Sequence, residues 1–287
     1  MKFKAYVILS AILFGINPTL MTLTYRTGAS ASATTCLSAL FAGVLCLIAA
    51  WRMKLSFRFS PKLWMQTLLT GFSGAICNQL LASAYQYVAP GIVTMLHFIY
   101  PTVVTVLLLV FFREKIGRWK PLALLCSTTG IVLISWGAME GSVKGVILAL
   151  ASSLFWAYYI ISLGKFEIGK ENPVVVCTVI YFVRVLVLLP YGLLNRSFTL
   201  PGVNGWMLIL LVSLLSLAAS ALFQIGTRNV GSFSAGIFSA FEPATSFLVS
   251  CLVFQHPVQW MQFVGVAAVI TGLILDSVGT RQMALSK

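Results

Sequence analysis

The segment GIFSAFEPATSFLVSCLVF (Gly236–Phe254) is long and apolar enough to cross a bilayer as a helix, yet Glu242 and Pro243 stand together in its middle. A proline inside a helix removes a backbone hydrogen bond and kinks the chain, because its ring clashes with the preceding turn. A charged side chain at bilayer depth costs at least about 2.5 kcal/mol, so such groups are rare and usually face a cavity or a partner. The segment therefore predicts a kinked transmembrane helix whose acid has a specific task.

The composition of the whole chain agrees with a membrane location. Of its 287 residues, 59% are hydrophobic and 9% are charged, whereas soluble domains have about 25% charged residues. The six cysteines all lie in apolar runs without a CxxC pair, which is typical of small buried hydrophobic residues. The start, MKFKAYVILSAILFG, lacks the cleavage site of a signal peptide, so we expect a retained first span. The sequence predicts an all-α integral membrane protein.

Hydropathy and loop signals together predict ten transmembrane helices, two of them centred on prolines. The predicted spans are 4–25, 31–51, 63–85, 91–112, 121–138, 145–163, 174–191, 205–226, 232–254 and 260–278.

The formal charge of +13 tests this topology. With a cytoplasmic N-terminus, fifteen lysines and arginines fall on the cytoplasmic side and three on the outer side, while Arg184 lies inside a span. This asymmetry is the positive-inside pattern, and it places both termini in the cytoplasm. The net charge is thus a topology signal, and we expect no nucleic-acid partner.

An internal repeat relates the two halves of the chain. An offset of 142 residues places Pro101 on Pro243, and Thr129-Gly130 on Thr271-Gly272. Sequence identity between the two halves is no higher than chance in so apolar a chain. The evidence for the repeat is therefore that the prolines and the Thr-Gly pairs all match at the same offset.

The first helices of the halves also correspond. The stretch SAILFG (Ser10–Gly15) lies beside ASSLFW (Ala151–Trp156) at an offset of 141. Five spans per half is an odd number, so the second half enters the membrane in the opposite orientation. We therefore expect two inverted repeats, residues 1–141 and 142–287, as in many secondary transporters.

Two stretches carry a resemblance to a known family. They are LASAYQYVAPGIVTMLHFIYPTVVTVLLLVFFREKIGRWKPLALLCSTTGIVLIS (Leu81–Ser135) and SAFEPATSFLVSCLVFQHPVQWMQFVGVAAVITGLIL (Ser239–Leu275). The chain resembles EamA-type transporters of the drug/metabolite transporter superfamily over nearly its whole length. That family has a mid-membrane proline, an acidic loop residue and a Gly-containing span in each half.

The match is closer in the first half than in the second. Pro101, Glu114 and Gly130 fit the family pattern, whereas His256 stands where the second half should have its acidic loop residue. A basic residue common in the second span is absent from Thr34–Gly43. The resemblance implies ten helices around a central cavity and transport of metabolites by alternating access.

Three interpretations of Glu242 remain open. It is a substrate or proton site, a structural partner of Arg184, or a protonated acid bonded to backbone carbonyls. Arg184 is equally ambiguous, because it could hold a substrate carboxylate or neutralise Glu242. Pro101 and Pro243 are candidate hinges.

Other polar and aromatic residues at membrane depth are candidate substrate ligands, with interhelical hydrogen bonding or ring packing as the alternative for each. Tyr100 occupies the repeat position of Glu242, and His97 lies one turn before Pro101. The remaining candidates are Asn17, Asn78, Gln79, Trp156, Tyr159 and Gln224.

These features predict a secondary carrier, and the resemblance implies an exporter of amino acids or related compounds in the inner membrane. If a proton is coupled to transport, we expect Glu242 to carry it. We expect no cofactor or metal, and we assume a monomer. The alternative is a membrane-embedded enzyme, but the sequence lacks the motifs of nucleotide-binding, metal or serine hydrolase sites.

Overall fold

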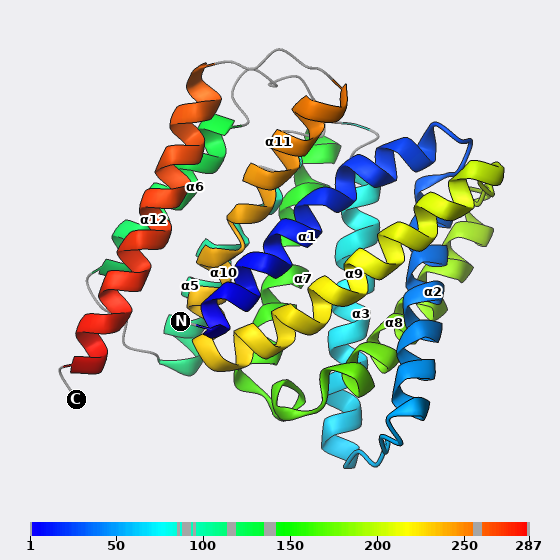
Figure 1. The fold of residues 1–287 in the computed structure, drawn as a ribbon, viewed down its shortest axis with the longest axis horizontal. Coiled ribbons are helices and arrows are strands. Elements are labelled where there is room, and N and C mark those ends of the chain that lie inside the picture. Colours follow the sequence, from blue (N-terminus) through cyan, green and yellow to red (C-terminus); the bar gives the residue numbers. More distant parts are fainter. Residues whose placement is uncertain are drawn as a thin grey trace.

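The computed structural model describes residues 2–84, 87, 93, 96–113, 119–134, 142–254 and 260–285. Within these residues all regular structure is helical, as the sequence predicts. The helices form one bundle, with α6 and α12 side by side at one edge and α2 and α8 at the other (Figure 1). Glu114 and His256, which entered the family resemblance, lie outside the described residues.

Each predicted span contains a helix. The helices are α1 (Lys2–Tyr25), α2 (Ala31–Arg52), α3 (Pro61–Ala84), α5 (Tyr100–Phe112), α6 (Trp119–Ile134), α7 (Val143–Lys165), α8 (Pro173–Leu194), α9 (Val203–Val230), α10 (Ser232–Phe238), α11 (Phe241–Phe254) and α12 (Trp260–Leu285). A short 3₁₀ helix, η1 (Glu167–Lys170), connects α7 to α8. Of the described helices, α1, α2, α7, α8 and α9 are long and apolar enough to cross a bilayer.

Local sequence explains where several helices begin and end. The side chains of Ser30 and Asn172 accept hydrogen bonds from the first turns of α2 and α8, and Pro173 opens α8. Both are standard N-terminal caps, since they satisfy amide groups that have no partner inside the helix. Gly231 ends α9 with a φ of 82°, a conformation that glycine adopts without strain.

The predicted span 232–254 is broken, as its central proline suggests. Helix α10 ends at Phe238 and α11 begins at Phe241. Pro243 has no amide hydrogen to donate to the Ser239 carbonyl, and the amide of Glu242 donates to it instead, at 2.8 Å. The prediction of a kink at Pro243 is confirmed, and the break places Glu242 in the first turn of α11.

A similar break precedes Pro101 in the first half. Helix α5 begins at Tyr100, and Phe98 and Ile99 form a turn before it. The start of α5 lies against α10, since a Cβ atom added to Gly236 would be 3.5 Å from the Cα atom of Pro101. The two breaks therefore lie close together in the bundle.

The helix pairs follow the internal repeat. Helix α1 packs on α9 and α11, and the corresponding helix α7 packs on α3 and α5. Helix α3 packs on α8, and its counterpart α9 packs on α2. The pairs α2–α8 and α6–α12 join corresponding helices to each other. Exchanging the two halves leaves this set of contacts unchanged.

The α6–α12 pair shows the same exchange at the level of single residues. A Cβ atom on Gly130 would be 2.6 Å from the carbonyl oxygen of Gly265 and 2.7 Å from the amide nitrogen of Val269. One on Gly272 would be 2.7 Å from the Ala123 carbonyl oxygen. Since Gly265 corresponds to Ala123 at an offset of 142, the contact is reciprocal, as in a twofold interface. Small residues allow this close approach, which drives helix association in lipid.

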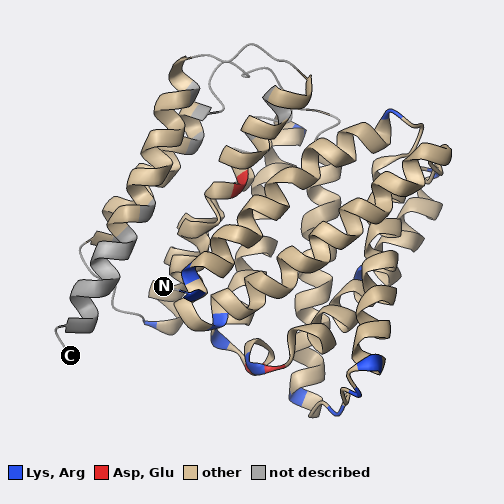
Figure 2. Ribbon diagram, in the orientation of Figure 1, with Lys and Arg blue, Asp and Glu red and all other residues tan. Residues whose placement is uncertain are grey.

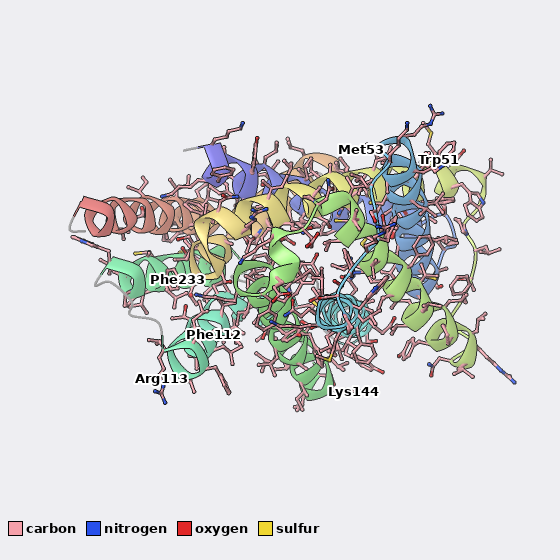
Figure 3. All side chains as sticks on the ribbon, turned by 90° about the horizontal axis from the view of Figure 1, so that it is seen from below. Trp51, Met53, Phe112, Arg113, Lys144 and Phe233 are labelled. Atoms are coloured by element: carbon pink, nitrogen blue, oxygen red, sulfur yellow. The ribbon has the colours of Figure 1, made fainter. Side chains whose placement is uncertain are left out.

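Basic residues gather at one end of the bundle, which we call the cationic end (Figure 2). The N-terminus, the end of α2 and η1 lie there. Trp51 and Met53, which are 74% and 57% exposed, lie at the C-terminal end of α2 (Figure 3). A tryptophan beside cationic residues is typical of a membrane–water interface.

The two ends of the bundle are closed by different contacts. At the cationic end, Lys62 of α3 forms an ion pair of 2.6 Å with Glu167 of η1, and Gln224 of α9 donates to the Ile168 carbonyl. At the opposite end, the α1–α2 and α8–α9 loops are joined by backbone groups and side-chain hydroxyls. The amide of Ser30 donates to Thr199, and the amide of Gly202 donates to Thr27.

Candidate functional site

Glu242 lies midway along the α10–α11 pair, where the red segment of α11 in Figure 2 marks it as the only acidic residue of that helix. Its side chain is half-buried, and it forms no ion pair or hydrogen bond with any described residue. Glu242 lies in the first turn of α11, and the N-terminus of a helix favours a negative charge. The carboxyl group is thus positioned by the helix break and remains available to a ligand.

Helix α1 passes tightly against the backbone of α11 at this point. A Cβ atom on Gly15 would be 2.6 Å from the carbonyl oxygen of Glu242 and 3.1 Å from the amide nitrogen of Ser246. Only glycine fits here, so Gly15 fixes the position of the first turn of α11. Sequence reasoning missed this role, although the alignment of Gly15 with Trp156 marked a position where the halves differ.

A row of aromatic side chains runs beside the two helix breaks. Trp156 of α7 stacks on Tyr159, with ring centres 4.8 Å apart and planes 5° from parallel. Its other neighbours are Tyr100 at 6.5 Å, Phe14 at 6.2 Å and Phe223 at 6.1 Å. Trp156 is half-buried, whereas Tyr100 and Tyr159 are buried.

The imidazole of His97 belongs to this group. Its Nδ1 atom lies 2.9 Å from Oγ of Ser152, and that hydroxyl donates to the Ala149 carbonyl at 2.6 Å. Since one hydroxyl has one proton, Ser152 accepts from Nδ1–H of His97. Nε2 is then the acceptor nitrogen of the ring. The predicted alternative, a histidine bonded across two segments, is present in the structure.

Tyr100 lies at the start of α5, beside Trp156 of the aromatic row. It is fully buried, and its hydroxyl oxygen has no hydrogen bond of ordinary geometry, although Ser239 and Trp156 are its polar neighbours. A buried hydroxyl without a hydrogen-bond partner is uncommon in folded proteins.

Arg184 lies in the middle of α8, 8% exposed. Its guanidinium carbon is 5.8 Å from the ring centre of Tyr159 and 5.3 Å from that of Tyr181. Its Nε atom is buried without a hydrogen-bond partner, and the guanidinium packs on Gly74 of α3, where a Cβ atom would be 2.8 Å from one of its nitrogens. Aromatic faces stabilise this cation, but no described carboxylate neutralises it.

Glu242 and Arg184 are therefore not an ion pair. The sole ion pair between described residues is Lys62–Glu167. Of the three interpretations of Glu242, pairing with Arg184 is excluded by this geometry.

The other polar candidates are distributed over separate contacts. Asn17 of α1 donates to Ser216 of α9 at 2.8 Å, and Gln224 donates to the Ile168 carbonyl at 3.2 Å, close to the cationic end. Gln79 bonds weakly to Ser83 on its own helix, and its side-chain oxygen is buried without a partner. Asn78 is half-buried on the same helix. Interhelical bonding, the predicted alternative, is observed for Asn17 and Gln224.

Comparison with known proteins agrees with this architecture. The model of the EamA-like transporter family matches the chain twice, over residues 2–136 and 143–277. The chain belongs to the EamA-like transporter family. Membership confirms the resemblance found in the sequence and the two-repeat architecture, and it makes this EamA-like protein a multi-pass membrane protein of transporter type.

One curated relative and one solved structure extend the comparison. The "Uncharacterized transporter YetK" of Bacillus subtilis (strain 168) is 24% identical over 192 residues, which is 63% of this chain and 58% of that protein. The chain thus aligns with somewhat more than half the length of this relative. A solved structure titled "Crystal structure of protein" has a TM-score of 0.83 at 14% identity, covering 98% of each chain, and it shows the shared fold.

Proposed function

We propose that this EamA-like protein is a secondary transporter that exports small metabolites, amino acids or related compounds, across the inner membrane by alternating access. The observation that carries the proposal is the Glu242 carboxyl, which lies at a helix break in the bundle centre and is bound to no described residue. Discontinuous helices with free termini near the bilayer midplane form the substrate sites of many secondary transporters.

The contact pattern supports alternating access. Helix pairs that remain unchanged when the halves are exchanged favour two inverted repeats, 1–141 and 142–287, with ten spans and both termini in the cytoplasm. Each end of the bundle has a contact that opening would break: Lys62–Glu167 at the cationic end, and Ser30–Thr199 at the other. The breaks at Pro101 and Pro243 are the proposed hinges.

Proton coupling is a second part of the proposal. Because Glu242 has no fixed cationic partner, its carboxyl can hold a proton in one half of the cycle and a substrate cation in the other. His97 and Tyr100 would line the same site. Lys and Arg at the cationic end would face the cytoplasm by the positive-inside rule.

Uptake of a mixture of labelled amino acids and amines into proteoliposomes, with and without a pH gradient, tests the proposal. We expect uptake that rises with the gradient and is lost in Glu242→Gln. Glu171→Gln, which removes an acid outside the long helices, is the matched control and should transport normally. Uptake by Glu242→Gln equal to wild type at every pH would exclude the proton role, and no uptake of any solute by wild type would exclude transport of these compounds.

A further inference from the structure

Arg184 places a permanent positive charge at membrane depth. It is the twelfth of the 22 residues of α8, so each end of the helix is about 15 Å away at a rise of about 1.5 Å per residue. Long basic side chains reach the membrane–water interface only from near the ends of a helix. A guanidinium also does not lose its proton in a protein, so this group cannot escape the cost of its charge by becoming neutral.

The described neighbours of Arg184 supply neither an anion nor a hydrogen-bond acceptor. The side chain is 8% exposed, its Nε atom is fully buried, and it makes no ion pair or hydrogen bond with any described residue. The rings of Tyr159 and Tyr181, at 5.8 Å and 5.3 Å from the guanidinium carbon, attract the cation but do not neutralise it. The five N–H donors of the group therefore lack an acceptor within the described part of the chain.

The guanidinium is nevertheless held in one orientation. A Cβ atom on Gly74 of α3 would be 2.8 Å, 3.1 Å and 3.3 Å from Nη2, Nε and Cζ of Arg184, so the flat face of the group lies against this glycine. The two flanking rings are fixed by other partners. The Tyr181 hydroxyl lies 2.9 Å from Oγ of Ser220, and the Tyr159 ring stacks on Trp156. A group that is already ordered loses little entropy when it binds a ligand.

The internal repeat shows that the helix packing does not require an arginine. Helix α2 packs on α9 as α8 packs on α3. At the offset of 142, the positions that correspond to Arg184 and Gly74 are Ala42 and Ser216. Ser216 accepts a neutral hydrogen bond of 2.8 Å from Asn17. The same scaffold is thus built once without a charge and once with it, which points to a task for Arg184 other than packing.

The charge and shape of the guanidinium select the ligand. Its neighbouring N–H groups match the two oxygens of a carboxylate, which can accept from both at once. One carboxylate also balances the single positive charge. A phosphate monoester has nearly two negative charges at neutral pH and would leave one of them uncompensated at membrane depth.

We propose that the guanidinium of Arg184 binds the carboxylate of the compound that this protein transports. The bound carboxylate neutralises the cation and accepts hydrogen bonds from its unpaired donors, so the complex is free of the cost that the unpaired charge carries. Gly74 is the positioning residue, because only glycine leaves room for the guanidinium in this orientation. The inference names the substrate class of the proposed transporter and rests on that proposed function.

Two probes isolate the carboxylate. They are norleucine and norleucinamide, which share the side chain and the ammonium group and differ only in the carboxylate that the amide replaces. Binding to the purified full-length protein is measured by thermal stabilisation, since a ligand of the folded state raises its stability. We expect norleucine to bind at least about tenfold more tightly than norleucinamide, because a hydrogen bond to a charged group is among the stronger ones.

Arg184→Met should remove this preference, so that both probes bind alike. In the ligand-free protein the same variant should unfold at the same temperature as wild type or higher, since an apolar side chain replaces an unpaired buried charge. A purely structural arginine would give the opposite result, a lower midpoint with the preference unchanged. Arg196→Met, which removes an exposed arginine from the loop after α8, is the matched control and should bind both probes like wild type.

Two further variants keep the proposal testable if Arg184→Met does not fold. Arg184→Lys retains the charge without the paired N–H groups, so it should weaken norleucine and leave norleucinamide unchanged. Gly74→Ala pushes the guanidinium out of place and should have the same effect. Gly43→Ala, whose Cβ atom would lie at an ordinary 3.4 Å from Tyr181, is its control and should bind both probes like wild type.

The outcomes separate this site from the proposed function. Equal binding of the two probes by wild type, no binding of either, or a norleucine preference that survives in Arg184→Met would each overturn the carboxylate site. Uptake of another solute by proteoliposomes in those cases would leave the transporter function intact. A norleucine preference that depends on Arg184, without uptake of any solute, would support the site and contradict the function.

Discussion

The centres of the two repeats share a backbone arrangement but differ in chemistry. Helices α5 and α11 both begin at a break next to a proline, and each packs on the first helix of the other half. At corresponding positions the first half has Tyr100 and the second has Glu242. The helix facing Glu242 has Gly15, whereas the helix facing Tyr100 has Trp156 at the corresponding place.

This difference makes the site one-sided. Gly15 lets α1 reach the backbone of α11 at Glu242, where a larger residue would not fit. At the corresponding place in the second half, the indole of Trp156 packs with the rings of Tyr100 and Tyr159. A duplicated scaffold thus provides the hinges twice, while a charge and an aromatic surface are each provided once. A neutral, symmetric pore would need neither the charge nor the aromatic surface. A site that selects an asymmetric molecule needs both.

The largest expected effect comes from comparing Glu242→Gln with Tyr100→Phe. A hydrogen bond to a charged group contributes about 1.5–3 kcal/mol, so Glu242→Gln should weaken binding of a transported cation or zwitterion roughly 10- to 150-fold. The Tyr100 hydroxyl has no hydrogen-bond partner in the empty protein, and its loss should cost about threefold or less. Dissociation constants for a cationic amine that the wild-type protein transports measure both. Equal losses would contradict the one-sided site.

The α6–α12 contact should instead respond equally in the two halves. A Cβ atom on Gly130 or Gly272 would meet backbone atoms at 2.6–2.7 Å, and overpacking of this kind costs about 1–3 kcal/mol. Gly130→Ala and Gly272→Ala should therefore both lower the thermal unfolding midpoint, by similar amounts. Gly43→Ala is the control, because its Cβ would lie at an ordinary 3.4 Å from Tyr181. A loss confined to one of the two glycines would show that the contact is not reciprocal.

Gly15→Ala should weaken ligand binding strongly while lowering the free energy of unfolding only moderately. The added methyl group would push the first turn of α11 away from α1, because the Glu242 carbonyl lies 2.6 Å from the new atom. We expect destabilisation of about 1–2 kcal/mol and weaker binding at Glu242, since the carboxyl moves with the helix turn. Unfolding midpoints and ligand titration on the same sample separate the two effects. Normal binding in a destabilised variant would limit Gly15 to a packing role.

The smallest effect concerns the two ends of the bundle. The hydrogen bond from Lys62 holds the pKa of the exposed Glu167 carboxyl below its usual range. A lowered carboxyl pKa stabilises the protein above the usual value, and this stabilisation is lost as the pH falls through the lowered value. Lys62→Met should abolish that slight pH dependence, and salt should weaken it in wild type.

The contact at the opposite end provides the comparison for this last test. It consists of backbone amides and hydroxyl groups, of which Ser30 and Thr199 are examples, and none of these titrates. Thr199→Val should therefore leave the pH dependence of unfolding unchanged. If Lys62→Met also leaves it unchanged, the ion pair does not contribute to closing the cationic end.

Several features of the site were predictable from the sequence. Pro101 and Pro243 indicated the two helix breaks, and the offset of 142 residues placed Tyr100 and Glu242 at corresponding positions. Trp156 and Tyr159, predicted as candidates on one helix, lie stacked. The sequence could not decide whether Glu242 pairs with Arg184, and it did not separate Gln224, near the cationic end, from the residues of the centre.

The sequence by itself determined the helices, their breaks and the family. In lipid every backbone polar group must be bonded within its own helix, so apolar length and proline position, both local properties, decide these features. Only the tertiary structure decided which side chains meet, because that depends on how far each helix is rotated and how closely it approaches its neighbours. Gly15 and Gly74 set those approaches for Glu242 and Arg184, and they leave the two charges apart.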